Sequence, residues 1–296
     1  MKTLKAVGKS CFSLIDDPMN SELKITSPIV SVEWLKTHLK HPNLVILNAT
    51  IPKVTGNDIN TINTQIPSTR FFDLKNKFSE VSALFPTTFP SEKQFTNEAQ
   101  ALGINKQSGI VVYDEKGIYS SARVWWLFKA FGFNNVAVLD GGFPAWEKAG
   151  FQTEPKQDHK NEFGNFEAKL QPKYMVFFKD VKNAAQDNKY LIIDARSENR
   201  FKGLEAEPRE GLRSGTIPNS VNLPFENLLD NKGFLKPEDA IKQLFQPLAD
   251  TNRELIFSCG SGITACVLAL GAEIAGYKNL SVYDGSWTEW GSLTNG

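Results

Sequence analysis

The chain has 296 residues, of which 41% are hydrophobic, and its 33 basic residues are balanced by 33 acidic residues. This length predicts two domains, each large enough to bury its own core. The balanced charge disfavours partners that bind through charge alone, so we expect neither nucleic acid nor a membrane surface as a partner. No apolar run approaches the roughly 18 residues that predict a membrane-spanning helix.

Cysteine and histidine are scarce in this sequence. Cys11, Cys259 and Cys266 are too few and too unevenly spaced for a disulfide framework, which favours a reducing compartment and predicts a cytoplasmic protein. None of the three histidines stands at metal-ligand spacing from a cysteine. We therefore expect no metal site.

Residues 1–27 begin with lysines and a short apolar stretch, but Asp16 and Asp17 follow early. A secretory signal would have a longer apolar core and a cleavage pattern of small residues. We predict a poorly ordered N-terminal extension, and an organelle import sequence is the alternative that its lysines and serines leave open.

From residue 28 onward, short apolar runs alternate with helical patterns such as SARVWWLFKAFG, residues 121–132. The alternation predicts an α/β fold with a mainly parallel sheet and helices on both faces. We expect the aromatic side chains of 123–128 to pack in a core or between the domains. Three apolar runs of the first half read as strands, namely LVILNA (44–49), IVVYD (110–114) and VAVLD (136–140).

The charged and amide-rich stretch 152–165 has almost nothing to bury and is predicted to be a linker. After it the pattern repeats: Asp284 follows Asp140 by 144 residues, and the Trp at the end of each copy shows the same offset. A repeat of this length is a whole domain. The sequence therefore predicts two tandem domains, over 28–151 and 166–296.

In the second half the apolar run LIFS leads directly into Cys259, and a helical pattern starts at Ile263. Ligands of parallel α/β sheets gather where strands end and helices begin. The helix N-terminus stabilises an anion there, so we expect a lowered pKa for the thiol of Cys259. Gly260 and Gly262 let the backbone curl so that several N–H groups converge. The loop thus predicts an anion-binding site with its own nucleophile.

Other interpretations of this loop remain open. An isolated Cys-Gly pair is more often a buried structural cysteine. GSGITA (260–265) also fits a dinucleotide-binding pattern, with Asp284 placed as a ribose-binding acid. Only 12 residues follow Asp284, too few for the further strands that would form the other side of a dinucleotide crevice. A cysteine phosphatase loop has five residues between its cysteine and an arginine, and at the position of that arginine this chain has Ala265. Phosphatase activity is therefore disfavoured. Cys266, nearly two helical turns after Cys259, is expected in the core.

The two-copy pattern, the loop CGSGIT (259–264) and the later VYDGSWTEW together resemble the rhodanese sulfurtransferases from about residue 28 to the end. The loop is most similar to that of the 3-mercaptopyruvate branch, because thiosulfate-using members usually carry basic side chains at the positions of Gly260 and Ser261. The resemblance implies two rhodanese-like domains, of which only the second is catalytic, since Asp114 stands in the first copy where Cys259 stands in the second.

What the resemblance implies is a ping-pong reaction without a cofactor. Cys259 takes a sulfane sulfur from 3-mercaptopyruvate, holds it as a persulfide, and passes it to cyanide or to a thiol such as thioredoxin or a small thiol. The loop residues Gly260, Gly262, Ile263 and Thr264 then bind the anion, because convergent N–H groups stabilise negative charge. A thiosulfate-using enzyme and a binding module without turnover are the alternatives.

The resemblance also assigns the substrate carboxylate and carbonyl to Arg200 and Arg209. A planar guanidinium can hold a carboxylate through two parallel hydrogen bonds, which lysine cannot do; otherwise both are ordinary surface charges. Ser261 is expected to orient the donor carbonyl or to move a proton. Relatives assist this serine with an acid and a histidine, but this chain has Lys75 and the histidine-free PTTFP (86–90) there, so neither role is carried over.

Overall fold

The computed structural model describes residues 22–52 and 62–295. Each half of the chain contains one five-stranded sheet, with strand orders β1-β6-β5-β2-β4 and β10-β9-β11-β12-β8, and all neighbouring strands in both sheets run parallel. The predicted strands are therefore confirmed. The first sheet consists of β1 (Ile29–Val30), β2 (Leu44–Asn48), β4 (Thr69–Phe71), β5 (Gly109–Tyr113) and β6 (Val136–Leu139), and the second of β8 (Met175–Val176), β9 (Tyr190–Asp194), β10 (Ser220–Asn222), β11 (Glu254–Ser258) and β12 (Leu280–Tyr283).

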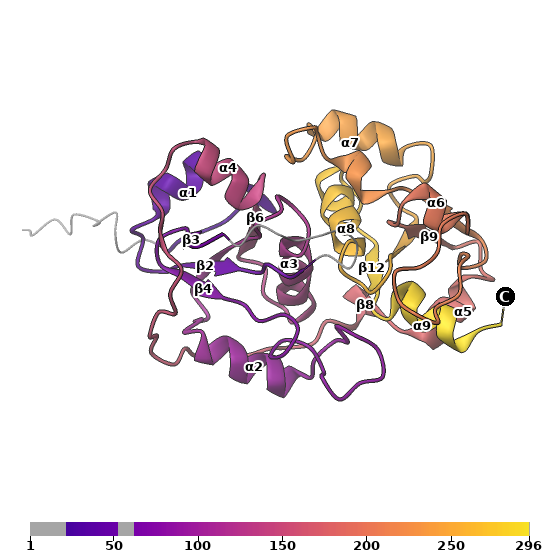
Figure 1. The fold of residues 1–296 in the computed structure, drawn as a ribbon, viewed down its shortest axis with the longest axis horizontal. Helices are drawn as coiled ribbons and strands as arrows, with labels where there is room; N and C mark the ends of the chain where they lie inside the picture. The colour runs from indigo at the N-terminus through magenta and orange to yellow at the C-terminus, as the bar shows by residue number, and fades with distance from the viewer. Residues whose placement is uncertain (1–21, 53–61, 296) are drawn as a thin grey trace, which may run out of the picture.

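Helices cover both faces of each sheet (Figure 1), as the alternation of runs predicted. In the first half α1 and α4 pack on one face and α2 and α3 on the other. In the second half α5 and α9 pack on one face and α7 and α8 on the other. The helices are α1 (Val32–His38), α2 (Glu92–Ala101), α3 (Ser121–Ala130), α4 (Gly142–Lys148), α5 (Phe178–Ala184), α6 (Glu198–Phe201), α7 (Glu238–Phe245), α8 (Ala265–Ile274) and α9 (Ser286–Leu293), with 3-10 turns at η2 (Pro172–Tyr174) and η3 (Phe225–Leu228).

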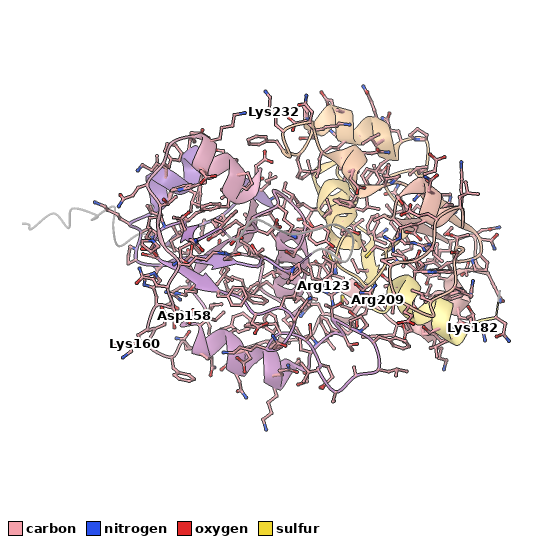
Figure 2. All side chains as sticks on the ribbon, in the orientation of Figure 1. Arg123, Asp158, Lys160, Lys182, Arg209 and Lys232 are labelled. Atoms are coloured by element: carbon pink, nitrogen blue, oxygen red, sulfur yellow. The ribbon has the colours of Figure 1, made fainter. Side chains whose placement is uncertain are left out.

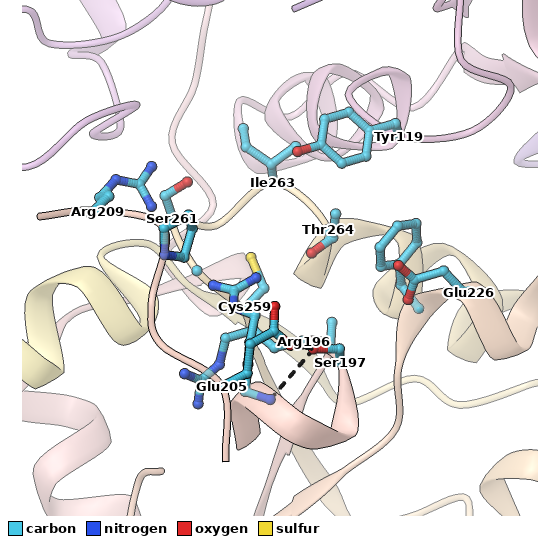
Figure 3. Close-up of a pocket in the computed structure, with 15 residues that line it drawn as sticks. Tyr119, Arg196, Ser197, Glu205, Arg209, Glu226, Cys259, Ser261, Ile263 and Thr264 are labelled. Atoms are coloured by element: carbon cyan, nitrogen blue, oxygen red, sulfur yellow. Dashed lines mark hydrogen bonds between the residues drawn. The ribbon is translucent and has the colours of Figure 1, made fainter. Parts of the chain in front are cut away.

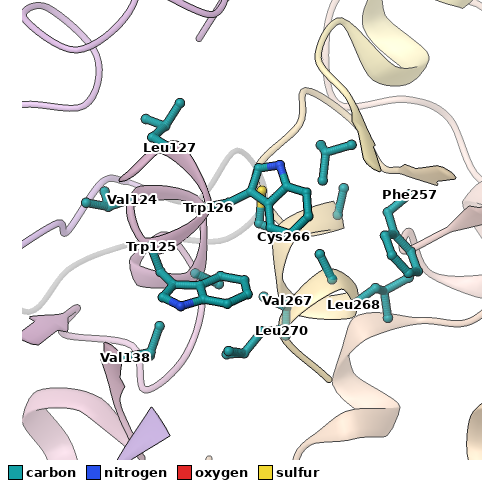
Figure 4. Close-up of a cluster of buried hydrophobic side chains, with 14 of the residues drawn as sticks. Val124, Trp125, Trp126, Leu127, Val138, Phe257, Cys266, Val267, Leu268 and Leu270 are labelled. Carbon is teal, nitrogen blue, oxygen red and sulfur yellow. The ribbon is translucent and has the colours of Figure 1, made fainter. Parts of the chain in front are cut away.

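The two halves share one core at their junction, where α3 packs against α8. Figure 4 shows Trp125 and Trp126 of α3 facing Cys266 and its neighbours on α8. These two tryptophans are 1% and 0% exposed, and Cys266 is 0% exposed. The predicted core role of the aromatic run and of Cys266 is confirmed, and burial raises the pKa of the Cys266 thiol to about 12.

Strand register fixes which residues correspond in the two halves. Tyr113 at the end of β5 pairs with Asn48, and Ser258 at the end of β11 pairs with Asp194. The next residue of the first half is Asp114, and that of the second half is the cysteine of the CGSGIT loop. Both residues therefore leave their sheets at equivalent points, because parallel strands in equivalent register end at the same edge.

Part of the predicted extension packs on the first half. Leu23 is 5% exposed, and the amide of Ile25 donates to Asn135 Oδ1 at 2.8 Å. The prediction of poor order is wrong for these two residues, because the buried side chain of Leu23 and the hydrogen bond of Ile25 to Asn135 hold them in place. Residues 1–21, which include Cys11, lie outside the described residues.

The predicted linker lies along the first half. It contains β7 (Glu154–Pro155), which pairs antiparallel with β3 (Thr64–Gln65), and the amide of Gly164 donates to Gln100 O at 2.8 Å. This polar segment has few side chains to bury, and backbone hydrogen bonds hold it against the first half instead. In the part of the chain that the structure describes, no helix is long and apolar enough to cross a bilayer.

Candidate active site

Cys259 lies in the loop between β11 and α8. This loop, residues 259–264, is here called the cysteine loop. The Cys259 side chain is 1% exposed, but it lines a cavity of about 260 Å³ (Figure 3). All predicted site residues except Gly262 line this cavity. A thiol in the wall of a cavity can meet a small molecule, whereas an ordinary core cysteine cannot.

The two glycines of the cysteine loop serve different purposes. Gly262 has a φ of +74°, a conformation that glycine adopts without steric cost, so the predicted curl of the backbone is confirmed there. Gly260 is not among the described glycines with positive φ. A Cβ at Gly260 would lie 3.2 Å from a guanidinium nitrogen of Arg200 and 3.7 Å from one of Arg209. The first distance is tight and the second is an ordinary van der Waals contact, so glycine at 260 leaves room for Arg200 while Arg209 lies close by.

The equivalent loop of the first half, residues 114–120 and here called the aspartate loop, binds an anion of its own. Oδ2 of Asp114 accepts hydrogen bonds from the amides of Tyr119 and Ser121, each at 2.9 Å. Because α3 begins at Ser121 and α8 at Ala265, these amides correspond to those of Ile263 and Ala265. The first half thus supports an anion-binding role for this type of strand-to-helix loop.

Arg200 and Arg209 both project toward the cavity, although they differ in their partners. Arg200 donates from its terminal nitrogen to Glu207 Oε2 at 2.6 Å. Among the described residues Arg209 makes no ion pair. Burial lowers the pKa of Arg209, and the negative charge of Cys259 opposes that shift. An unpaired, half-buried cation beside the thiol favours an anionic ligand.

The sequence analysis missed the buried charges that support this site. Arg196 donates to both carboxylate oxygens of Asp194 and, at 2.7 Å, to Glu207 Oε1. Glu207 thus lies between Arg196 and Arg200, and its side chain is 0% exposed. Only the motif Asp-Ala-Arg, which starts with the last residue of β9, hinted at this cluster. The cluster fixes the position of Arg200, because a buried carboxylate must keep its partners.

The first half reaches into the cysteine loop through Arg123, which is 1% exposed. Arg123 donates to Asp284 Oδ1 at 2.6 Å and to the carbonyl oxygens of Thr87 and Gly262 at 3.1 and 3.4 Å. Asp284 also accepts from the amide of Phe89 at 2.8 Å. Both oxygens of the Asp284 carboxylate therefore accept hydrogen bonds from the protein itself. This arrangement disfavours the dinucleotide interpretation, in which Asp284 binds a ribose.

Figure 2 places Arg123 and Arg209 near the junction of the halves, whereas Lys160, Lys182 and Lys232 lie at the periphery.

Tyr119 comes from the first half and lines the cavity beside the cysteine loop. Burial raises the pKa of Tyr119 to about 12, and the charge of Cys259 adds to the rise. Tyr119 therefore stays protonated at neutral pH.

Ser261 lies in the cavity wall with 8% of its surface exposed. Its carbonyl oxygen accepts from Thr87 Oγ1 at 2.8 Å, so the histidine-free PTTFP segment contacts the loop backbone. Lys75 is exposed and lies outside the cavity lining. Ile263 and Thr264 line the cavity. Their proposed roles and that of Ser261 stay predictions.

Comparisons with known proteins agree with this geometry. The model of the rhodanese-like domain matches residues 31–149 and 178–293. The mitochondrial thiosulfate/3-mercaptopyruvate sulfurtransferase 1 of Arabidopsis thaliana is 38% identical over 294 residues, which cover 91% of this chain and 77% of the relative. The 3-mercaptopyruvate sulfurtransferase of Mus musculus is 36% identical over 273 residues, covering 88% and 91% of the two chains.

The fold is also similar to that of a solved structure. The crystal structure of SseA from Escherichia coli, a 3-mercaptopyruvate sulfotransferase by its published description, superposes with a TM-score of 0.79 and 30% identity, covering 88% of this chain and 99% of SseA. A family model that matches both halves and relatives named as enzymes favour catalysis over a binding module. The chain belongs to the rhodanese family, with two rhodanese-like domains in tandem, and is a sulfurtransferase.

Proposed function

We propose that the enzyme transfers a sulfane sulfur from 3-mercaptopyruvate to a thiol or cyanide through a persulfide on Cys259. One observation carries this proposal: two guanidinium groups lie over Gly260, next to the nucleophile, and Arg209 has no ion-pair partner among the described residues. A donor with a carboxylate two bonds from its reactive carbon fits such an arrangement.

The first step is a nucleophilic displacement at sulfur. The Cys259 thiolate attacks the sulfur of 3-mercaptopyruvate, the new S–S bond forms, and the C–S bond breaks with its electron pair going to carbon. The carbon product is the enolate of pyruvate, which takes up one proton. In this proposal Arg209 holds the carboxylate and Arg200 stabilises the charge that develops on the enolate oxygen.

The second step returns the cysteine to its thiolate. An acceptor thiolate or cyanide attacks the outer sulfur, the S–S bond breaks, and Cys259 leaves with the electron pair. The products are an acceptor persulfide or thiocyanate. We propose thioredoxin or a small thiol as the acceptor in a reducing compartment such as the cytoplasm, because the few cysteines of the chain favour such a compartment.

The donor is tested by comparing kcat/KM for 3-mercaptopyruvate and thiosulfate. We expect a preference of about 10-fold or more for 3-mercaptopyruvate, since the carboxylate gains two charge-assisted hydrogen bonds. Intact mass of the enzyme after incubation with 3-mercaptopyruvate alone should show the gain of one sulfur. A clear preference for thiosulfate would replace the proposed donor, and absence of any adduct would contradict the persulfide.

Replacing Arg209 with lysine tests how the donor is held. We expect kcat/KM for 3-mercaptopyruvate to fall by about 10-fold, because a point charge replaces a two-pronged donor, while thiosulfate is affected less. Steady-state kinetics with both donors measure the difference. Lys202→Ala is the matched control, since Lys202 is exposed and pairs with Glu198. Equal kinetics in Arg209→Lys and the wild type would remove Arg209 from the site.

A further inference from the structure

Ser286 places a hydroxyl inside the cysteine loop. This residue begins α9 and is 0% exposed. Its Oγ accepts hydrogen bonds from the amides of Cys259 and Gly262, each at 3.1 Å. It also donates to Tyr283 O at 2.9 Å. One oxygen therefore ties the first and fourth residues of the cysteine loop together and fixes its curvature.

The same hydroxyl is within reach of the reacting sulfur. Ser286 Oγ lies 3.9 Å from Cys259 Sγ, a hydrogen-bond distance when sulfur is the acceptor. The hydroxyl has one proton and two acceptors for it, the neutral Tyr283 carbonyl and the sulfur. Two N–H groups already donate to Oγ, which polarises its O–H bond. The proton is drawn toward the sulfur when the sulfur carries a negative charge.

The backbone at Ser286 is unusual for a residue with a side chain. Its φ is +50°, a conformation that costs free energy for every residue except glycine. At the offset of 144 residues the first half has Gly142, with a φ of +58°. A Cβ at Gly142 would collide with the carbonyl oxygens of Gly117 and Asp114. The half with the cysteine thus carries a strained serine where the other half carries an unstrained glycine.

The two loops receive a hydroxyl from different positions. In the aspartate loop Ser121 Oγ donates to Asp114 Oδ2 at 2.7 Å. The residue equivalent to Ser121 is Ala265, which has no hydroxyl. In the cysteine loop the hydroxyl comes instead from Ser286. In each loop, one buried hydroxyl therefore lies within hydrogen-bond reach of the side chain that follows the strand, Asp114 in the first half and Cys259 in the second.

We propose that Ser286 shapes the cysteine loop and donates its hydroxyl proton to the Cys259 sulfur while that sulfur is charged. This inference rests on the proposed function, because the Ser286 hydroxyl would stabilise the Cys259 thiolate both as the nucleophile of the first step and as the leaving group of the second. No covalent bond breaks, because the proton stays on Ser286 Oγ. Only its hydrogen bond changes, from Tyr283 O to the sulfur.

Two variants remove the hydroxyl in different ways. Ser286→Ala keeps the strained backbone, whereas Ser286→Gly relieves it and copies Gly142. The matched control is Ser121→Ala, which removes the buried hydroxyl of the aspartate loop. The pH dependence of iodoacetamide alkylation is followed by peptide mass, so that Cys259 is counted separately from the other cysteines.

We expect both Ser286 variants to raise the apparent pKa of Cys259 alkylation by about one unit and to lower kcat/KM for 3-mercaptopyruvate by about 10-fold. Ser121→Ala should leave both quantities unchanged. The glycine variant should unfold at no lower temperature than the alanine variant, because it relieves the strain at φ +50°.

The outcomes separate this inference from the proposed function. If the wild type gains a sulfur but both Ser286 variants keep its alkylation pKa and kcat/KM, Ser286 has only a structural role and the inference is overturned. A fall in thermal stability alone has the same meaning. If the wild type gains no sulfur, the proposed function fails, and the alkylation pKa still decides whether Ser286 stabilises the thiolate.

Discussion

The Cys259→Ser variant is expected to lose sulfur transfer, with kcat/KM for any sulfur donor reduced by about 10⁴-fold or more. A serine hydroxyl is protonated at neutral pH and cannot form a persulfide, so neither half of the reaction can proceed. Pyruvate release from 3-mercaptopyruvate and thiocyanate formation from cyanide measure the loss. The fold should be unaffected, because serine is similar in size to the 1% exposed cysteine that it replaces.

Cys266→Ser is the matched control for this variant. Cys266 is fully buried on α8 and its Sγ donates to Gly262 O at 3.3 Å, a contact that a hydroxyl can keep. We expect this control to retain turnover within a few-fold of the wild type. Substantial transfer by Cys259→Ser would show that another group carries the sulfur, and the proposed mechanism would be wrong.

Replacing Arg123 with methionine is expected to lower the free energy of unfolding by about 3–5 kcal/mol. The change leaves the Asp284 carboxylate, 3% exposed, without its cation, and it frees the carbonyl oxygens of Thr87 and Gly262. Urea unfolding followed by tryptophan fluorescence measures the loss. The second variant, Arg123→Met with Asp284→Asn, should recover part of it, because no uncompensated charge remains buried.

Asp140→Asn provides the control for this junction. Asp140 is the counterpart of Asp284 in the first half and accepts from the amide of Leu235 at 3.0 Å. The position equivalent to Arg123 in the second half is Val267, so Asp140 has no arginine from that position. We expect Asp140→Asn to cost about 1 kcal/mol. If Arg123→Met costs no more than this control, the ion pair with Asp284 does not hold the halves together.

The repeat and the position of the cysteine could be read from the sequence. Short apolar runs followed by helical patterns specify parallel strands locally, and offsets of about 144 residues between matching motifs showed that the pattern occurs twice. Cys259 follows β11 directly, so its place at the edge of the sheet needed no knowledge of distant residues. Asp114 and Cys259, 145 residues apart, were equivalent because each directly follows the matching strand of its copy, and the strand register agrees with this pairing.

The charges and hydroxyl that surround the cysteine could not be read in this way. Arg123 and Asp284 are 161 residues apart, and Cys259 and Ser286 are 27 apart, in contacts that exist only after the sheets form and the halves pack. Sequence patterns report which side chains are apolar and how they repeat, whereas a buried polar group is defined by partners from other elements. The sequence by itself determined the fold, the duplication and the place of Cys259 directly after a strand. The tertiary structure decided which polar groups surround that cysteine, because a buried polar group depends on hydrogen bonds to partners from other elements.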